Sequence, residues 1–340
     1  MLRIAFTGTG YISQIHARAA QKLPDVELAA VVNHRPESMA AFAAEFGVAR
    51  QLASTDELQS DGKIDALVVG TPNYLHAPQT IAALNSGVHV MVEKPMAMDA
   101  AEARAMLEAS QQSGALLMVA HCWRFDPEVL WLREQVADGR LGKIIRTKGY
   151  GVHVNWGPGG WFTQKEFAGG GAMADVGIHA LDTARFLLGD PQPASVFARL
   201  GTHYGDYDVD DTGNLLVNWD NDASSQIESG WWQPHADGPE AATQLYGRSG
   251  FGQLFPTYLK APDRSQPVAA HPLVDPGFPK VRDPHCPQSL YDDQMAYFVT
   301  CIRENRRPIP GGLEGWINMK VVDAAYKSSE TGELIELIEK

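Results

Sequence analysis

The sequence predicts an α/β fold that begins with a doubly wound parallel sheet. Over residues 1–121 short, nearly continuous apolar runs alternate with amphipathic segments, and the first run ends in a glycine turn that opens a helix. Strands covered by helices on both faces are apolar along their whole length, and alternation of strand and helix is typical of parallel sheets. A chain of 340 residues is expected to form two domains. We place them at residues 1–121 and 122–340.

The elements of the first domain follow from local signals. Strands are expected in the apolar runs at residues 4–6, 28–32, 66–69, 88–92 and 116–119. Pro36 and Gly47 bound one helix, because proline favours a first turn and glycine ends a helix. Asp99, three residues before Glu102, and Gly114 bound another helix in the same way.

The turn Gly8-Thr9-Gly10 joins the first strand to a helix with small or apolar residues on one face. In such a turn the pyrophosphate of a dinucleotide can rest on the N–H groups of the helix N-terminus. Ser13 replaces the third glycine of the usual pattern and is still small enough for close helix packing. A tight turn without a ligand is the alternative, and the full alternation of strand and helix favours the nucleotide.

Asn33, His34 and Arg35 stand where an acidic residue usually holds the ribose 2′-hydroxyl of NAD, about 20 residues beyond the glycine turn. A carboxylate there would repel a 2′-phosphate, whereas an amide with Arg35 could accept one through charge-assisted hydrogen bonds. The segment therefore favours NADP over NAD. NAD stays open, because Asn33 can also bond a ribose diol.

Composition restricts the class of protein. The chain is 44% hydrophobic and 20% charged, and it lacks an uncharged apolar run long enough to cross a bilayer, so we expect a soluble protein. A net charge of −13 argues against nucleic acid and membrane surfaces as partners. Cys122, Cys286 and Cys301 have neither disulfide nor metal-site spacing. We therefore expect free thiols, no metal and a cytoplasmic protein.

The second half of the chain is predicted to be rich in strands joined by hairpins. β-branched and aromatic stretches with polar breaks cover residues 143–154, 194–204, 212–219, 223–233 and 242–246. Within the third stretch Leu215, Val217 and Trp219 alternate with Asn214, Leu216 and Asn218. One face of such a sheet needs cover, so a homodimer or homotetramer is expected to form through its outer face.

Five segments in order resemble the glucose-fructose oxidoreductase and inositol dehydrogenase family, called Gfo/Idh/MocA. They are GTGYIS (8–13), TPNYLH (71–76), VEKP (92–95), GGGAMADVGIHALD (169–182) and YDDQMAYFVTCIRENRRPIP (291–310). The resemblance implies an N-terminal Rossmann domain, a C-terminal α/β domain with a large, open, mostly antiparallel sheet, and a tightly bound NAD or NADP. With the ribose segment, the implied cofactor contacts are Gly8, Thr9, Gly10, Tyr11, Ile12, Asn33, His34, Arg35, Thr71, Pro72, Asn73, His76, Glu93 and Lys94.

By the same resemblance Lys94, Asp175 and His179 match the family's catalytic positions, and the Lys94-Pro95 bond is expected to be cis. Oxidation of an alcohol by nicotinamide needs an acceptor for the hydroxyl proton and a donor at the reacting oxygen. We expect His179 to be the base, Lys94 the donor and proton relay, and Asp175 the orienting carboxylate. Which of Lys94 and His179 takes the first proton stays open.

The backbone around these residues supports the assignment. Pro95 restricts Lys94 to extended geometry, which fixes the direction of its side chain. Asp175 and His179 are four residues apart and would share one face of a helix. The three glycines at 169–171 would let that helix approach the cofactor closely.

His153, Asn155 and Trp161 are the candidate substrate contacts. Aromatic faces beside hydrogen-bonding groups suit a sugar, polyol or cyclitol, whereas a phosphorylated substrate usually needs an arginine fork. The tryptophan could equally belong to the core or to an interface. Two other functions stay open: an NAD-dependent glycoside hydrolase that oxidises its substrate transiently, and a non-catalytic NAD(P)-binding regulator. The presence of both Lys94 and His179 favours an enzyme that acts on CH–OH groups.

Overall fold

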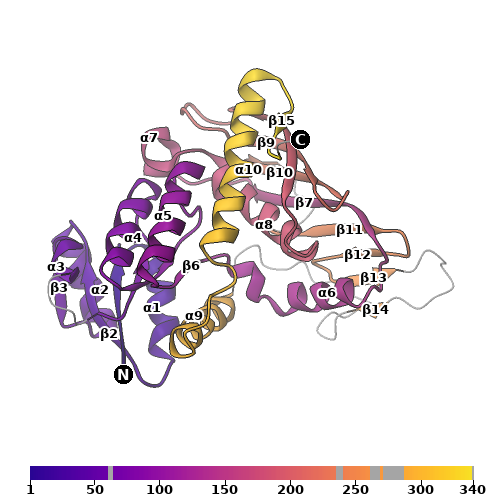
Figure 1. Cartoon of the computed structure of the whole chain (residues 1–340). Helices are drawn as coiled ribbons and strands as arrows, with labels where there is room; N and C mark the ends of the chain where they lie inside the picture. Colours follow the sequence, from indigo (N-terminus) through magenta and orange to yellow (C-terminus); the bar gives the residue numbers. More distant parts are fainter. Residues whose placement is uncertain (60–63, 235–239, 261–268, 271–286, 339–340) are drawn as a thin grey trace. The chain divides into compact units, whose positions relative to one another are not determined.

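The computed structural model describes residues 1–59, 64–234, 240–260, 269–270 and 287–338 (Figure 1). The chain forms two compact units. The first contains residues 1–122 and 287–319, and the second contains residues 123–286 and 320–340. One domain was expected over residues 122–340, whereas the contacts of residues 287–319 assign that segment to the first unit.

The first unit is built on a parallel sheet of six strands in the order β3-β2-β1-β4-β5-β6. The strands are β1 (Leu2–Thr7), β2 (Val26–Val32), β3 (Arg50–Leu52), β4 (Ala66–Val69), β5 (His89–Val92) and β6 (Leu117–Val119). This confirms the doubly wound α/β class, in which the strand order reverses between β1 and β4. The sequence did not indicate β3, which has only three residues.

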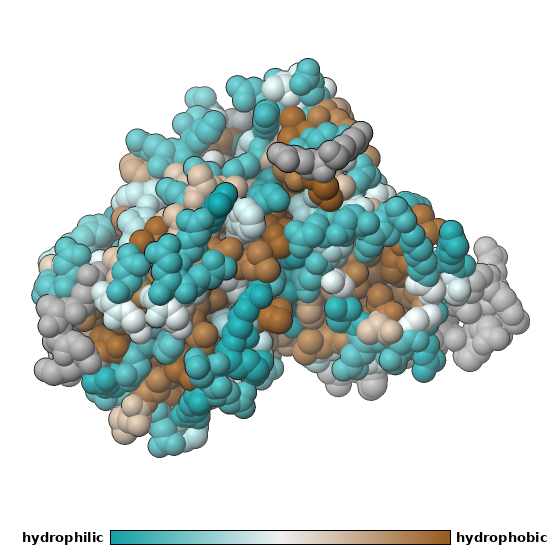
Figure 2. Space-filling model, viewed as in Figure 1, coloured by the Kyte–Doolittle hydropathy of each residue, from teal (hydrophilic) through white to brown (hydrophobic). Residues whose placement is uncertain are grey.

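Helices cover both faces of this sheet. They are α1 (Tyr11–Gln21), α2 (Pro36–Phe46), α3 (Asp56–Gln59), η1 (Asn73–Leu75), α4 (His76–Asn85), α5 (Ala100–Ser113) and α9 (Gln288–Arg303), with the start of α10 (Gly312–Thr331). Figure 1 shows α4 and α5 side by side, and mostly hydrophilic or intermediate residues cover their outer surface in Figure 2. The side chain of Asp99 caps α5, and Gly47 and Gly114 end α2 and α5 in the left-handed conformation. The expected helix ends are confirmed.

Helix α9 packs against α1 inside the first unit. Gln288 donates a hydrogen bond to the carbonyl oxygen of Ile15 at 3.1 Å, and Lys22 pairs with Asp292. Met295 and Phe298 on α9 are buried. These long-range contacts explain why a segment that is far away in the sequence belongs to the first unit.

The second unit contains a mixed sheet in the order β14-β13-β12-β11-β7-β10-β9-β8-β15. Its strands are β7 (Ile144–Val154), β8 (Pro193–Gly201), β9 (Thr212–Trp219), β10 (Ser224–Gln233), β11 (Thr243–Gly247), β12 (Phe251–Gln253), β13 (Tyr258–Lys260), β14 (Ala269–Ala270) and β15 (Ile335–Glu336). All neighbouring strands pair antiparallel except β7 and β10, which are parallel. The expected open, mostly antiparallel sheet is confirmed.

The remaining elements of the second unit are short helices and two longer ones. They are η2 (Cys122–Phe125), α6 (Pro127–Ala137), η3 (Gly160–Thr163), α7 (Lys165–Ala168), the π-helical turn η4 (Met173–Gly177) and α8 (Ile178–Leu187), with the end of α10. Gly151 lets β7 approach η4, because a side chain at this position would collide with the carbonyl oxygen of Val176. Leu215, Val217 and Trp219 are buried inside the unit, whereas Leu216 is exposed on the opposite face of β9.

Two further features of the described residues concern membrane-spanning helices and metal sites. Of the helices in the described ranges, none combines the length and the apolar character that a membrane span requires. Those same ranges contain no group of three or more His, Cys, Asp or Glu side chains that could hold a metal ion. Cys122 and Cys301 are buried free thiols, and Cys286 lies outside the described residues.

Candidate active site

Four loops of the first unit leave the same edge of the parallel sheet. They follow β1, β2, β4 and β5, and they contain the turn at Gly8 and the residues Asn33, Thr71 and Lys94. Because the carboxyl ends of parallel strands meet at one edge, and because ligands of such sheets bind there at the reversal of strand order, this edge is the candidate cofactor site. The structure therefore brings these four predicted segments to one edge.

The turn after β1 fits a dinucleotide pyrophosphate. Gly8 has a φ of +83°, and a Cβ atom there would lie 2.5 Å from the carbonyl oxygen of Gly70, so a side chain has neither the conformation nor the space it needs. Gly10 is the N-cap of α1 and no side chain among the described residues caps this end. A Cβ atom at Gly10 would meet no described atom within 4 Å. The N-terminus of α1 thus has open space beside Gly10 among the described residues, as an anion site at a helix N-terminus requires.

Ser13 packs against a glycine of the neighbouring loop. Its hydroxyl donates to the carbonyl oxygen of Gly70 at 3.4 Å, and a side chain at Gly70 would collide with it. Ser13, the small residue at the third position of the glycine pattern, therefore packs against a second small residue, Gly70, in the loop that follows β4.

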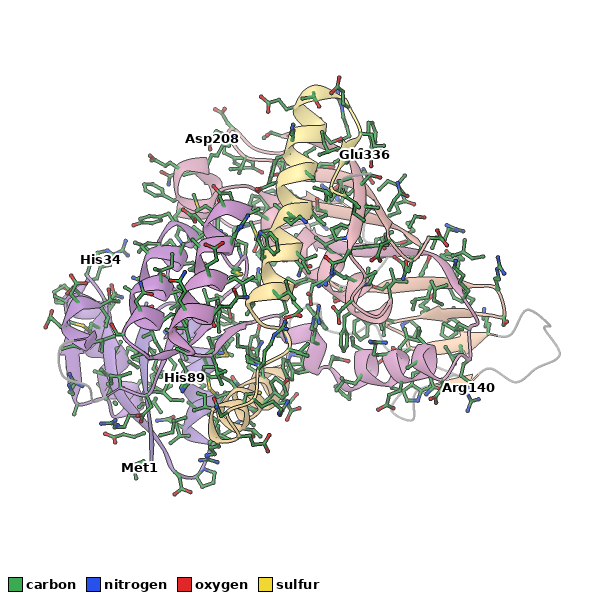
Figure 3. The ribbon with its side chains drawn as sticks, in the orientation of Figure 1. Met1, His34, His89, Arg140, Asp208 and Glu336 are labelled. Carbon is green, nitrogen blue, oxygen red and sulfur yellow. The ribbon has the colours of Figure 1, made fainter. Side chains whose placement is uncertain are left out.

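Asn33 is held to the glycine turn. Its amide nitrogen donates a hydrogen bond to the hydroxyl of Thr9, and its amide oxygen accepts the backbone N–H of Arg35 at 3.0 Å. His34 and Arg35 are exposed, and Figure 3 labels His34 on the surface. The amide of Asn33 thus lies beside the glycine turn, and Arg35, two residues later, is exposed on the surface.

His76 connects the loops that follow β4 and β5. Its Nε2 lies 2.8 Å from the carbonyl oxygen of Thr71, and its Nδ1 lies 2.8 Å from that of Pro95. Burial lowers the pKa of His76, and the two carbonyl groups oppose this effect only in part. Because its ring lies between the carbonyl groups of Thr71 and Pro95, His76 supports the backbone of both loops from inside the unit.

The side chain of Glu93 also points into the first unit, toward His16. Its Oε1 lies 2.6 Å from Nε2 of His16, which is fully buried on α1, and its Oε2 accepts the backbone N–H of Lys94 at 3.1 Å. Burial alone would raise the pKa of Glu93, but the hydrogen bond and charge of His16 bring it below its ordinary value. Glu93 therefore fixes the backbone of Lys94, and the Lys94-Pro95 bond is cis as expected.

In the second unit Asp175 and His179 stand on either side of a change in helix type. Residues 173–177 form a π-helical turn and α8 begins at Ile178, so the regular helix expected through both residues is wrong. Single π-helical turns occur frequently at functional sites. The turn is held at its start by Asp210, which accepts the N–H groups of Gly171 at 2.9 Å and Met173 at 2.8 Å.

The glycines before this turn have reasons inside the second unit. Gly169 ends α7 with a left-handed φ of +77°. A side chain at Gly170 would collide with the hydroxyl of Tyr326, and one at Gly171 with the backbone of Asp210. Packing against Asp210 and Tyr326 therefore requires glycine at these two positions, and the close approach to the cofactor stays a prediction.

Asp175 and His179, the two predicted catalytic residues of the second unit, each have a partner that the sequence did not reveal. Nε2 of His179 lies 3.0 Å from Oε1 of Glu240, whereas the indole nitrogen of Trp231 donates to Asp175 at 3.1 Å. Glu240 precedes β11, and Trp231 lies on β10. The described carboxylate partner of His179 is thus Glu240, a residue that the sequence did not point to.

The candidate substrate residues lie near the end of β7. His153 is buried on the strand and stacks on Trp156, with ring centroids 3.7 Å apart. It lies on the same face of β7 as Gly151, which contacts the π-helical turn. Asn155 follows in the left-handed conformation with a φ of 54°. Trp161 stacks on Phe162 at 3.8 Å, so its described ring contact is with its own neighbour rather than with His153.

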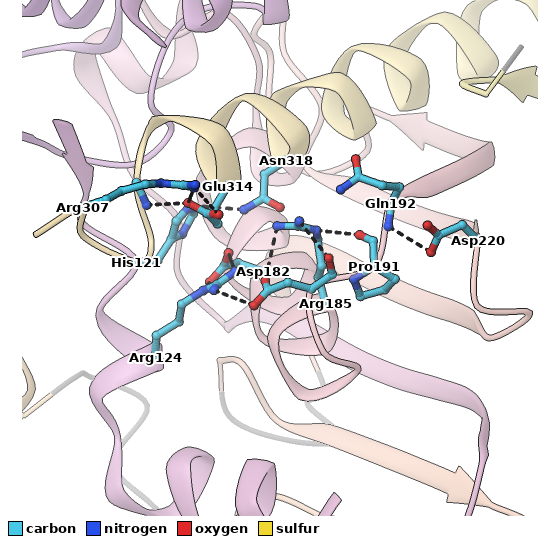
Figure 4. Close-up of polar contacts among 12 residues, drawn as sticks. His121, Arg124, Asp182, Arg185, Pro191, Gln192, Asp220, Arg307, Glu314 and Asn318 are labelled. Atoms are coloured by element: carbon cyan, nitrogen blue, oxygen red, sulfur yellow. Dashed lines mark hydrogen bonds and ion pairs between the residues drawn. The ribbon is translucent and has the colours of Figure 1, made fainter. Parts of the chain in front are cut away.

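A buried network of charges holds α8. Arg124 binds Asp182 through two hydrogen bonds of 2.8 Å and also pairs with Asp190, and Arg185 donates to the carbonyl oxygen of Pro191 (Figure 4). Burial alone would lower the pKa of Arg124, but the two carboxylates raise it. Since Arg124 and Asp182 are only 2% exposed, this network anchors the helix that carries His179.

Comparison with known proteins agrees with this arrangement. Residues 2–121 match the family model described as an oxidoreductase family with an NAD-binding Rossmann fold, and residues 129–251 match the Gfo/Idh/MocA C-terminal domain. The chain is 29% identical to a D-glucoside 3-dehydrogenase of Escherichia coli K12, over 99% of this chain and 97% of that protein.

Two further proteins extend the comparison. A 1,5-anhydro-D-fructose reductase of Ensifer adhaerens is 28% identical over 99% of both chains. The crystal structure of an aldose-aldose oxidoreductase from Caulobacter crescentus, complexed with glycerol, superposes with a TM-score of 0.84 at 27% identity and covers 99% of both chains.

Proposed function

Because the chain belongs to the Gfo/Idh/MocA family of oxidoreductases, we propose that it is an NAD(P)-dependent dehydrogenase or reductase of sugars, polyols or cyclitols. The bound nicotinamide would supply the chemistry by exchanging a hydride with the CH–OH carbon of the substrate. The observation that carries the proposal is that Lys94 follows β5 at the same sheet edge where the open glycine turn follows β1. The lysine thus belongs to the unit that would hold the cofactor.

We propose that Gly8, Thr9, Gly10, Tyr11 and Ile12 hold the pyrophosphate, and that Thr71, Pro72 and Asn73 line the nicotinamide side. Asn33, His34 and Arg35 would bind the adenosine ribose. The amide of Asn33 and the exposed guanidinium of Arg35 favour a 2′-phosphate, so NADP is the proposed cofactor and NAD the alternative. His76 and Glu93 would act indirectly, by holding Thr71 and Lys94.

His179 is the proposed base for the substrate hydroxyl proton. Lys94 donates a hydrogen bond to the reacting oxygen and relays the proton. Asp175, held by the indole of Trp231, would orient the substrate hydroxyls rather than His179. His153, Asn155 and Trp161 are proposed substrate contacts, because their aromatic and amide groups suit an uncharged carbohydrate.

The glycosidase and regulator alternatives are not favoured, since the named relatives are dehydrogenases and reductases. We also propose a homodimer or homotetramer that forms through the outer face of the large sheet. On that face Phe197 and Leu216 are paired across β8 and β9 and are 44% and 43% exposed. We also propose a cytoplasmic location, because the thiols of Cys122 and Cys301 are not in disulfides, as is usual in a reducing compartment.

The test is a direct assay of the purified chain with NADP⁺ and NAD⁺ against a panel of free sugars, polyols and cyclitols. A rise in absorbance at 340 nm with at least one of them is expected. A parallel assay with aryl glycosides detects the glycosidase. Release of the aryl group without any net change at 340 nm across the panel would reject the proposed dehydrogenase.

A further inference from the structure

Glu240 and His179 form a buried pair that the roles proposed above do not use. Oε1 of Glu240 lies 3.0 Å from Nε2 of His179, and the two side chains are 13% and 6% exposed. The same oxygen accepts a hydrogen bond from the indole nitrogen of Trp123 at 3.5 Å. Trp123 is itself buried and packs its ring against Phe255, so the carboxylate is held from two sides.

The pairing determines which nitrogen of His179 can act as a base. An ionised carboxylate only accepts hydrogen bonds, so the hydrogen of a neutral imidazole must be on Nε2 when Glu240 is bound there. The lone pair is then on Nδ1, which is buried and has no hydrogen-bond partner among the described residues. A base needs such an unused lone pair, because a nitrogen that carries a hydrogen cannot accept a proton.

We propose that Glu240 is a positioning residue that keeps the hydrogen of His179 on Nε2 and leaves Nδ1 as the atom that accepts the substrate hydroxyl proton. This rests on the proposed function, in which His179 is the base. When the proton arrives at Nδ1, the ring becomes a cation and the adjacent carboxylate stabilises it.

The first test observes the ring directly and needs neither substrate nor cofactor. Long-range ¹⁵N–¹H NMR of the full chain with labelled histidine, assigned with His179→Gln, reports which ring nitrogen carries the hydrogen. The Nε2–H form is expected for the neutral ring of His179. In Glu240→Leu, whose side chain at position 240 cannot accept a hydrogen bond, the Nε2–H form should be lost or mixed with the Nδ1–H form. An Nδ1–H form in the wild-type protein would overturn the proposal.

The second test is kinetic. Glu240→Gln removes the charge with little change of shape, and Glu166→Gln, which changes an exposed side chain on α7, is the matched control. We expect Glu240→Gln to lower kcat at least about 10-fold, within the roughly 10² to 10⁴ that a general base contributes. The affinity for NADP⁺ should stay within about twofold, and the control should keep both values.

The outcomes separate this inference from the proposed function. Wild-type kcat in Glu240→Gln overturns the positioning role and leaves the dehydrogenase intact. Absence of activity in the wild-type protein overturns the dehydrogenase itself, and the positioning role with it. If Glu240→Gln does not fold, Glu240→Asp is used, which keeps the charge on a shorter side chain. It is expected to retain the Nε2–H form with a lower kcat, and loss of that form would contradict the proposal.

Discussion

Alanine at Gly8 should act mainly on stability and alanine at Gly10 mainly on cofactor binding, although only Thr9 separates the two positions. At Gly8 the φ of +83° costs an L-residue about 1–2 kcal/mol. The new Cβ would also lie 2.5 Å from a backbone oxygen that cannot rotate away, and such overpacking costs about 1–3 kcal/mol. Gly8→Ala should therefore lower the free energy of unfolding by about 2–5 kcal/mol.

Gly10 has a φ of −71°, and nothing described lies within 4 Å of the new Cβ. Gly10→Ala should cost only about 0.5–1 kcal/mol, because alanine is a poorer N-cap than glycine. The methyl group would nevertheless fill the space proposed for the pyrophosphate, so the Kd for NADP⁺ should rise at least about tenfold, or about 1.4 kcal/mol.

Urea unfolding followed by circular dichroism measures the first effect, and isothermal titration with NADP⁺ measures the second. Gly47→Ala is the matched control, because its φ is +69° but its Cβ would meet open space. It should show only the conformational cost of about 1–2 kcal/mol and unchanged binding. A Gly8→Ala protein no less stable than Gly47→Ala, or a Gly10→Ala protein with wild-type affinity, would refute the reasoning.

Three further substitutions test other parts of the account. Asn33→Asp should raise the ratio of kcat/KM with NAD to that with NADP at least about tenfold, because a carboxylate repels the 2′-phosphate; an unchanged ratio contradicts the NADP proposal. In the wild-type protein folding lowers the pKa of Glu93. The stability that this gives is present above the pKa of Glu93 in the unfolded chain, and it is lost as the pH falls through the pKa of Glu93 in the folded protein. His16→Ala should cost about 1.5–3 kcal/mol at pH 7, and it should cost less at pH 5, because burial then raises the pKa of Glu93. Equal losses in urea unfolding at both pH values would contradict this. Arg124→Ala leaves the carboxylate of Asp182 buried and should destabilise the second unit by about 3–5 kcal/mol; a loss below about 1 kcal/mol by tryptophan fluorescence would show that the network is not needed.

The elements that could be predicted from the sequence are those with local signals. Pro36, Gly47, Asp99 and Gly114 mark helix ends through backbone conformation and capping, and both depend only on neighbouring residues. The glycine turn was recognisable because Gly8 needs a positive φ. Continuous apolar runs gave the parallel strands, but three-residue β3 was too short to show a pattern.

The features that were missed depend on contacts between distant residues. The pairing of His16 with Glu93 spans 77 residues, and α9 joins the first unit across most of the chain. No local pattern near Glu240 indicates a partner for His179, since the contact is set by the loop that leads into β11. The π-helical turn and the packing of the glycines before it could not be predicted for the same reason, because their partners Asp210 and Tyr326 follow far along the chain.

The most direct test of the central claim compares the wild-type protein with Lys94→Ala in two measurements on the same samples. Reduction of NADP⁺ at 340 nm with the best sugar of the panel measures turnover, and isothermal titration measures cofactor affinity, with Lys165→Ala on exposed α7 as the control. If Lys94 acts at the reacting oxygen, Lys94→Ala should lose at least about 10² in kcat while its Kd for NADP⁺ stays within about twofold of the wild-type value. Near wild-type turnover in Lys94→Ala would contradict it.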